Sequence, residues 1–224
     1  MKISAAYLVR EALDIFFPGL CVTCGKNAGK EKYICSRCRE TLLLGGLKKT
    51  VYRNRENLHR LYYLYHYDYY KGIELGAAVR ELKYAGRTGL ARELGMLLAE
   101  TASRLTDFIT ADVVTGIPLH PARRRERGFN QSQLVAERLA EGLGLEYMKT
   151  LERITNTASQ AELSSRLREL NVRGVFRVGP DADIAGKTII LLDDQSTTGA
   201  TLDNAAGALY GAGAEIVLPL SITH

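Results

Sequence analysis

Two adjacent carboxylates followed by a short run rich in threonine are the residues of this chain best suited to bind a phosphorylated sugar. Asp193 and Asp194 repel a phosphate, but they accept hydrogen bonds from neutral sugar hydroxyls. The run that follows precedes an expected helix, and it comprises Thr197, Thr198, Gly199, Ala200 and Thr201. A helix start favours a phosphate, so a ribose with a 5′-phosphate fits both halves of the loop. The alternative is an ordinary strand-to-helix turn, in which Asp caps the helix and Gly permits the bend.

A second loop, which follows another predicted strand, is rich in basic residues. They are Arg123, Arg124, Arg125 and Arg127, with Gly128 next in the chain. Guanidinium groups match the oxygens of a pyrophosphate, whose charge must be neutralised when it leaves. A solvated basic loop or a contact with a DNA backbone is the alternative. Lys83 is a further candidate to face a phosphate, although a solvated helix end fits this residue equally well.

The four cysteines lie in two Cys-x2-Cys pairs separated by ten residues, and they are Cys21, Cys24, Cys35 and Cys38. Two such pairs bring four thiolates around one tetrahedral zinc ion. With every position taken by protein, the ion has no open site for chemistry. Its expected role is to fold a segment too short to form a core. Redox pairs or disulfides are the competing interpretations, and a reducing cytoplasm argues against them.

Apolar runs of strand length precede both candidate loops. The runs from Thr188 to Leu192 and from Asp112 to Pro118 are typical of buried strands in a parallel sheet. Apolar positions at helical spacing follow each loop, from Leu202 to Leu209 before Gly211 and from Leu134 to Leu143. Strands that alternate with helices predict an α/β domain.

The length and charge of the chain bound its class. At 224 residues, it can hold one α/β domain and a small appendage. A net charge of +5 and a pI near 9.0 favour polyanionic ligands. Charged residues interrupt the segment from Met1 to Leu20, which therefore predicts neither a signal-peptide core nor a membrane span. We expect a cytoplasmic protein without membrane insertion.

The acidic pair and the threonine run resemble the phosphoribosyl pyrophosphate motif of type I phosphoribosyltransferases. The resemblance implies that Asp193 and Asp194 hold the ribose 2′- and 3′-hydroxyls, while Thr197 to Thr201 surround the 5′-phosphate. The chain departs from that family at Gln195 and Ser196, where the family usually has apolar residues that anchor the loop. Polar residues there predict a less rigid loop.

Five motifs in a fixed order resemble the ComF family over nearly the whole chain. They are Cys-x2-Cys…Cys-x2-Cys, Leu-Lys-Tyr-x-Gly, Arg-Gly-Phe-Asn-Gln, Thr-x2-Gln-x5-Arg-x4-Asn and Asp-Asp-x2-Thr-Thr-Gly-Ala-Thr. The fourth motif resembles the mobile catalytic loop of the amidophosphoribosyltransferase-like branch, and the resemblance implies that Arg166 or Arg173 would close over pyrophosphate. The resemblance implies a type I phosphoribosyltransferase fold over residues 51–224, preceded by a helix and zinc module at residues 1–50.

The ComF resemblance also implies a link to natural competence, with cytoplasmic handling of incoming single-stranded DNA beside a helicase-like partner. The first function it allows is a magnesium-dependent phosphoribosyltransferase, in which Asp193 and Asp194 position the sugar and Arg127 stabilises the departing pyrophosphate. The second is a non-catalytic module that binds single-stranded DNA, and the third is a regulator that senses phosphoribosyl pyrophosphate without turnover. A homodimer is a further expectation, and the sequence defines no acceptor substrate.

Overall fold

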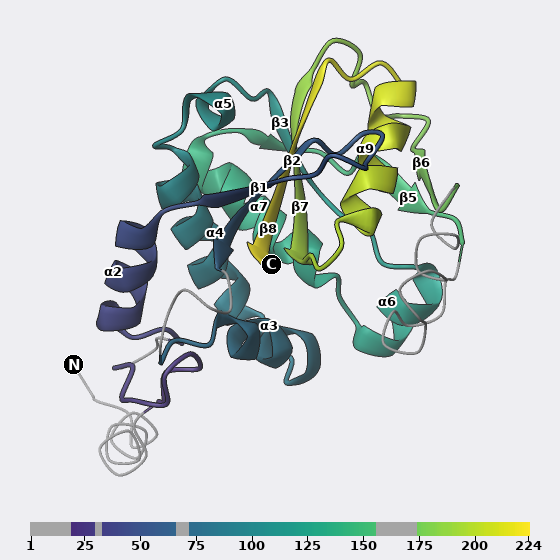
Figure 1. Cartoon of the computed structure of the whole chain (residues 1–224). Helices are drawn as coiled ribbons and strands as arrows, with labels where there is room; N and C mark the ends of the chain where they lie inside the picture. Colours follow the sequence, from purple (N-terminus) through teal and green to yellow (C-terminus); the bar gives the residue numbers. More distant parts are fainter. Residues whose placement is uncertain (1–18, 30–32, 66–71, 156–173) are drawn as a thin grey trace, which may run out of the picture.

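The computed structural model describes residues 19–29, 33–65, 72–155 and 174–224 (Figure 1). The helix expected before Leu20, and the polar segment that contains Arg166 and Arg173, lie outside these ranges. The helices are α2 (Ser36–Gly45), α3 (Leu75–Tyr84), α4 (Gly89–Ala102), α5 (Thr106–Ile109), α6 (Pro121–Arg127), α7 (Gln131–Leu143) and α9 (Ala200–Gly211). The strands are β1 (Lys48–Val51), β2 (Arg60–Tyr65), β3 (Val113–Gly116), β4 (Glu146–Tyr147), β5 (Leu151–Arg153), β6 (Phe176–Val178), β7 (Thr188–Gln195) and β8 (Ile216–Thr223).

Six strands form the central sheet, in the order β1-β2-β8-β7-β3-β4. β1 is antiparallel to β2, and the other four pairings are parallel. Nearly every residue of β3 and β7 is buried, because both faces of a parallel sheet are covered by other elements. β5 and β6 form a separate antiparallel pair. This topology confirms the predicted α/β class with a mostly parallel sheet.

The two faces of the sheet bury different sets of residues, because successive side chains of a strand point to opposite faces. Ile190 and Leu192 of β7 pack in the apolar cluster that includes α3, α4 and α7. Ile189 and Leu191 pack in the cluster that includes α9 and β6. Figure 1 shows the corresponding layers, with α9, β5 and β6 on one side of the sheet and α4 and α7 on the other.

The basic stretch that the sequence predicts as a loop forms helix α6 instead. His120 caps this helix, because its Nδ1 accepts a hydrogen bond from the Ala122 N–H at 3.2 Å. Pro121 follows as the first helical residue, a position where its missing N–H costs nothing. Gly128 then ends the helix at a φ of 82°, in the left-handed region that favours glycine. The loop prediction was wrong, because proline and glycine mark the two ends of a short helix as well as a loop.

The start of helix α7 packs against the end of β3. This packing places the first residues of α7 at the end of the sheet. Asn130 caps the helix by accepting from the N–H groups of Ser132 and Gln133, and its Nδ2 donates to the Ile117 carbonyl. A Cβ on Gly116 would lie 2.8 Å from the Ser132 carbonyl oxygen, so a larger residue there would push the helix away. The glycine therefore fixes how closely Ser132 approaches the neighbouring strand.

The cysteine segment packs directly on the sheet domain. The N–H groups of Tyr33 and Ile34 donate to the two carboxylate oxygens of Glu93 in α4, at 2.7 and 2.9 Å. Cys21 and Cys38 belong to the same buried cluster as α3 and α4. The boundary at residue 50 stays a prediction. Within the described ranges, no helix combines the length and the apolar character that a membrane span needs.

Candidate functional site

The acidic pair lies near the carboxyl end of β7, and it is buried. Asp193 and Asp194 are only 9% and 4% exposed. The strand continues past the pair to Gln195, which pairs with Thr223 of β8. The sequence places the pair directly after the apolar run from Thr188 to Leu192, at the open end of a strand where it would face ligand and solvent; the structure instead includes the pair in the strand and buries it. Because neighbouring residues of a strand point to opposite faces, the two carboxylates have different surroundings.

Asp193 is held by two hydrogen bonds to one of its oxygens. The Ser132 hydroxyl donates to Asp193 Oδ1 at 3.3 Å, and the Asp194 N–H donates to the same oxygen at 2.9 Å. Burial and the charge of Asp194 raise the pKa of Asp193 to about 7, although Lys83 and the two hydrogen bonds oppose the rise. The Asp193 carboxyl group therefore keeps its proton to a higher pH than an exposed aspartate does.

Asp194 contacts the ammonium group of Lys83, which comes from the last turn of α3. Lys83 Nζ lies 3.0 Å from Asp194 Oδ1, and the two side chains are 16% and 6% exposed. This contact rules out the solvated helix end as the position of Lys83. The second oxygen, Asp194 Oδ2, is buried and has no hydrogen-bond partner among the described residues. A buried acceptor of this kind is costly unless a ligand or water supplies a donor.

The residues Thr197 to Thr201, called the threonine loop below, connect β7 to α9: Thr197 to Gly199 lie between the two elements, whereas Ala200 and Thr201 begin the helix. The connection is anchored through the backbone of Ser196. The Ser196 N–H donates to the Thr223 carbonyl at 3.0 Å, and the Ser196 carbonyl lies 3.1 Å from His224 Nδ1. Ser196 is buried, whereas Gln195 is exposed. Main-chain contacts with the end of β8 thus provide an anchor that does not require the apolar side chains missing from this loop.

Packing behind the loop also constrains it. Gly199 precedes α9 with a φ of 76°, and a Cβ there would lie 2.5 Å from Leu58 Cδ2 and 3.1 Å from Tyr52 Cζ. Arg55 Nη2 donates to the Thr198 carbonyl at 2.9 Å. The segment after β1 therefore supports the loop from outside. Sequence reasoning missed this segment, because no local pattern links it to a loop more than a hundred residues away.

Asp203 ties the same segment to the start of α9. Its Oδ1 accepts hydrogen bonds from the N–H groups of Asn57 and Leu58, at 2.8 and 2.9 Å. Asp203 is a further residue that sequence reasoning missed. An acidic side chain in the first turn of a helix is visible in the sequence and is stabilised by the helix dipole. Its distant backbone partners are not visible.

One side of α6 lines a cavity of 450 Å³ next to α3. Arg123 and Arg127, four residues apart and hence on one face of the helix, line it together with Lys83 and Tyr84. Arg127 Nη1 donates to Gln131 Oε1 at 2.6 Å, and its guanidinium group lies 5.5 Å from the centre of the Tyr84 ring. The structure thus gathers three positive side chains in this cavity, and one of them also contacts the acidic pair.

The other predicted residues of α6 line a larger cavity of 760 Å³, which contains Arg124, Arg125 and Gly128. Arg153 of β5 also lines it, with its guanidinium group 5.6 Å from the centre of the Phe176 ring. Burial lowers the pKa of Arg153, and the nearby charge of Arg123 lowers it further. The arginines of α6 are therefore divided between two cavities, and they do not form the single cationic site expected of one loop.

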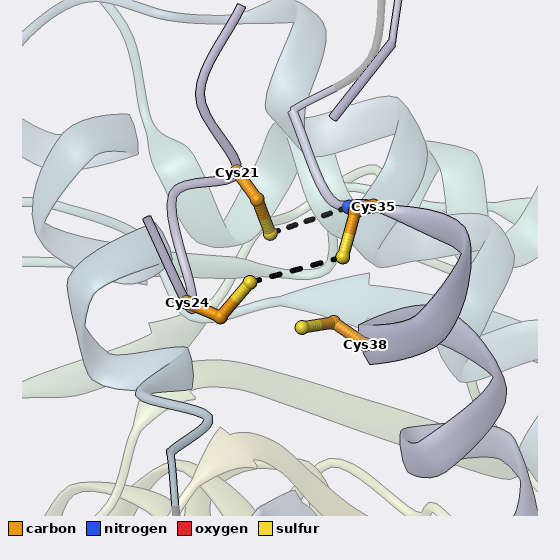
Figure 2. Close-up of side chains that lie close together, drawn as sticks. All are labelled: Cys21, Cys24, Cys35 and Cys38. Carbon is orange, nitrogen blue, oxygen red and sulfur yellow. Dashed lines mark hydrogen bonds between the residues drawn. The ribbon is translucent and has the colours of Figure 1, made fainter. Parts of the chain in front are cut away.

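Figure 2 shows the sulfur atoms of the four cysteines facing a common centre. Cys21 and Cys24 come from a turn, whereas Cys35 and Cys38 come from the start of α2. The four sulfur atoms all lie within 4.8 Å of one another, and Cys24 Sγ is 3.8 Å from Cys35 Sγ. All four are free thiols, so the disulfide alternative does not apply to this structure. Zinc–sulfur bonds of about 2.3 Å place the sulfurs of a tetrahedral site about 3.8 Å apart, so the cluster fits a metal ion such as zinc.

The turn between the first two cysteines is built by local hydrogen bonds. Gly25 adopts a φ of 71°, and its N–H donates to the Cys21 carbonyl at 2.8 Å. Burial by itself would raise the pKa of Cys21, but hydrogen bonds from Thr23 and the Cys35 N–H outweigh it and lower the pKa to about 6. Burial raises the pKa of Cys38. A metal ion is bound by thiolates, and several thiolates close together repel one another. A bound cation offsets this repulsion, so the buried cluster favours a cation at its centre.

Comparison with known proteins finds relatives over most of the chain. The DNA utilization protein YhgH of Salmonella typhi is 32% identical over 202 residues, which cover 88% of this chain and 81% of that protein. Competence protein F of Haemophilus influenzae is 25% identical over 213 residues, which cover 92% and 90%. Competence protein ComFC of Streptococcus pneumoniae is 38% identical over 108 residues, which cover 48% and 46%. No protein-family model matches the chain.

Two solved structures illustrate the structural likeness. The glutamine phosphoribosylpyrophosphate amidotransferase of B. subtilis, complexed with ADP and GMP, is 27% identical, with a TM-score of 0.39 over 57% of this chain and 24% of that chain. The adenine phosphoribosyltransferase of Saccharomyces cerevisiae is 14% identical, with a TM-score of 0.40 over 83% and 87%. At such TM-scores the superposition is partial, and the likeness by itself assigns no function.

Proposed function

This chain belongs to the ComF family, and we propose that the carboxyl end of its strand β7 binds a ribose carrying a 5′-phosphate. The observation that supports this proposal most strongly is Asp194 Oδ2, a buried carboxylate oxygen without a partner among the described residues. It lies next to a second buried carboxyl group, Asp193, and two residues separate it from the threonine loop. A ligand that donates hydroxyl hydrogen bonds and carries an anionic group matches this combination.

The hydroxyl groups of a ribose suit the acidic pair because they donate hydrogen bonds without bringing charge. A hydrogen bond to a charged acceptor contributes about 1.5–3 kcal/mol, and here it also relieves the unpaired Asp194 Oδ2. Ionisation of Asp193, whose pKa is raised to about 7, adds a second charged acceptor beside it. Both interactions favour a sugar over an apolar ligand.

The phosphate of such a ligand would lie at the loop of Thr197 to Thr201 and the start of α9. The first N–H groups of a helix have no acceptor within the helix, and the helix dipole favours an anion there. The contacts of Ser196 with β8 and the packing around Gly199 support the loop from behind. A supported loop loses little conformational entropy when an anion binds, which favours affinity.

Phosphoribosyl pyrophosphate is the ligand that family membership implies. The cavity lined by Arg123, Arg127 and Lys83 supplies positive charge near the acidic pair, which suits a pyrophosphate group. In the proposed transfer reaction, the bond from the anomeric carbon to pyrophosphate breaks as the bond to the acceptor forms, with positive charge developing on the ribose. Arg127 and Arg123 would stabilise the leaving group, while the acidic pair fixes the sugar. The predicted magnesium ion would neutralise charge on the pyrophosphate oxygens when it is bound there.

A second candidate function, binding of single-stranded DNA, is favoured by Tyr84. This side chain is 77% exposed, and the Arg127 guanidinium group lies 5.5 Å from the centre of its ring. An exposed aromatic ring beside cations is a surface on which unpaired bases stack. The names of the relatives, DNA utilization protein and competence protein F, agree with this candidate. A helicase-like partner and a homodimer stay predictions.

Calorimetric titration with ribose 5-phosphate tests the proposed binding site. Asp194→Asn should weaken binding about 10- to 150-fold, the equivalent of one charge-assisted hydrogen bond. Asp181→Asn is the matched control, because Asp181 is an exposed carboxylate in a turn after β6. Equal affinities for wild type and Asp194→Asn, with both proteins folded in a thermal melt, would refute the site.

A pyrophosphate-release assay then separates the enzyme from the alternatives. The protein is incubated with magnesium, phosphoribosyl pyrophosphate and a panel of bases and amines as acceptors. Acceptor-dependent release supports a phosphoribosyltransferase. Salt-dependent binding of single-stranded DNA without release supports the DNA-binding module. A change in DNA affinity on addition of phosphoribosyl pyrophosphate, again without release, supports a sensor.

A further inference from the structure

Lys83 reaches the acidic pair from a position that the fold fixes. It follows Leu82, which is completely buried, in the last turn of α3. Its Nζ is 3.0 Å from Asp194 Oδ1, and little of either side chain is exposed. Water screens such a pair only weakly, so the ammonium charge acts strongly on the carboxylate. Lys83 is therefore part of the site, unlike a surface lysine with a mobile side chain.

The acidic pair does not fit a divalent cation. A magnesium ion binds carboxylate oxygens at about 2.0–2.1 Å and needs near-octahedral geometry. Asp194 Oδ1 already contacts the Lys83 ammonium group, which would repel a second cation beside it. Asp193 Oδ1 accepts two hydrogen bonds, from Ser132 and from the Asp194 N–H. Asp194 Oδ1 and Asp193 Oδ1 therefore already have donors that the protein itself supplies.

The second oxygen of Asp194 is available to a ligand. Asp194 Oδ2 is buried and has no partner among the described residues, and it belongs to the same carboxylate that Lys83 neutralises. A hydroxyl group can donate to this oxygen without displacing the ammonium group. A metal ion would have to compete with that ammonium group for the same carboxylate.

We propose that the Lys83 ammonium group occupies the place beside Asp194 where a divalent metal ion would otherwise bind. The acidic pair then accepts the hydroxyls of a ribose phosphate without a divalent metal ion. The part concerning the ribose rests on the proposed function, whereas the part concerning the metal does not. Lys83 is a positioning residue, because it acts through Asp194. Magnesium that accompanies phosphoribosyl pyrophosphate would then have to be held by the ligand, because the acidic pair would not hold it.

Titration of the zinc-loaded protein with Mn²⁺ alone, followed by electron paramagnetic resonance of the free ion, tests the metal part without any sugar. Lys83→Met keeps the length of the side chain and removes its charge. This variant should bind one Mn²⁺ at least tenfold more tightly than wild type. Adding Asp194→Asn to it should abolish the gain, and Lys83→Arg should behave as wild type.

The wild-type titration alone can overturn the proposal. If wild type binds Mn²⁺ and Asp194→Asn removes that binding, the acidic pair holds a metal despite Lys83. A Lys83→Met variant that is folded and gains no Mn²⁺ affinity overturns it as well. Lys149→Met is the control, because this exposed lysine lines the other cavity.

Titration with ribose 5-phosphate in metal-depleted buffer, with and without added magnesium, tests the ribose part. Chelators are avoided because they remove zinc. Wild-type affinity should change less than twofold on addition of magnesium, whereas Lys83→Met should bind at least tenfold more tightly with magnesium than without. A wild type that requires magnesium overturns the inference. A wild type that binds under neither condition defeats the proposed function, and the Mn²⁺ titration still decides the role of Lys83.

Discussion

Replacing Gly199 with alanine tests whether packing behind the threonine loop holds it in a conformation that binds phosphate. The backbone at Gly199 has a φ of 76°, and holding an ordinary residue in this left-handed region costs about 1–2 kcal/mol. The new Cβ would also lie 2.5 Å from Leu58 Cδ2 and 3.1 Å from Tyr52 Cζ. Overpacking of this kind costs about 1–3 kcal/mol. The two effects together lower the free energy of unfolding by about 2–5 kcal/mol.

Gly186→Ala is the matched control for this variant. Gly186 has a φ of 70°, but nothing lies within 4 Å of the position of a Cβ there. It should therefore show the backbone strain alone, about 1–2 kcal/mol. For a chain of this size, each kcal/mol lowers Tm by about 2–4 °C. The expected decrease is about 2–8 °C for Gly186→Ala and about 4–20 °C for Gly199→Ala.

Two measurements on these variants show whether Leu58 and Tyr52 hold the loop in the conformation that binds phosphate. Differential scanning calorimetry gives Tm, and calorimetric titration gives the affinity for ribose 5-phosphate. Gly199→Ala should lose at least tenfold in affinity, because Leu58 is completely buried and the close contact is expected to be relieved by a shift of the loop. Gly186→Ala should bind as wild type does. Equal decreases in Tm would show that Leu58 and Tyr52 do not constrain the loop, and an unchanged affinity of Gly199→Ala would refute its role in binding.

Three further predictions concern the metal, the arginines and pH. Protein purified without added zinc should contain one zinc ion per chain by elemental analysis, and Cys38→Ser should lower both the zinc content and Tm; a metal-free protein with an unchanged Tm would contradict this. Arg123→Met with Arg127→Met should weaken binding of phosphoribosyl pyrophosphate far more than binding of ribose 5-phosphate, whereas equal losses would indicate nonspecific attraction. Because the pKa of Asp193 rises from 3.8 to about 7 on folding, the folded protein holds this proton more tightly, so its stability should decrease as pH rises from about 4 to about 7. Urea denaturation across this range should show a smaller decrease for Asp193→Asn, and an equal decrease would count against the buried carboxyl group.

The sequence predicted the elements around the site because each has a local signal. The apolar run of β7 and the helical spacing of α9 are visible in the residues themselves, and α9 ends at Gly211 as predicted. The four cysteines were predictable as one cluster, because the spacing of the pairs matches the geometry of a tetrahedral ion. Family membership was predictable from the order of the motifs along the chain, and the relatives confirm it.

Contacts between distant segments were not predictable. Nothing near Lys83 in the sequence shows that its ammonium group meets Asp194, because the contact depends on how α3 packs beside the sheet. The burial of the acidic pair depends in the same way on β8, which extends the pairing of β7 to Gln195. The charge composition also does not predict that the arginines of α6 line two different cavities, because this arrangement depends on the helix that they form.

A crystal structure of the protein with ribose 5-phosphate would show whether the carboxyl end of β7 binds the sugar. We expect a sugar hydroxyl within 3.2 Å of Asp194 Oδ2, a normal hydrogen-bond length. We also expect the phosphate at the loop from Thr197 to Thr201, with Lys83 still in contact with Asp194. A phosphate bound between the arginines of α6, with Asp194 Oδ2 still without a partner, would show that the acidic pair does not bind the sugar.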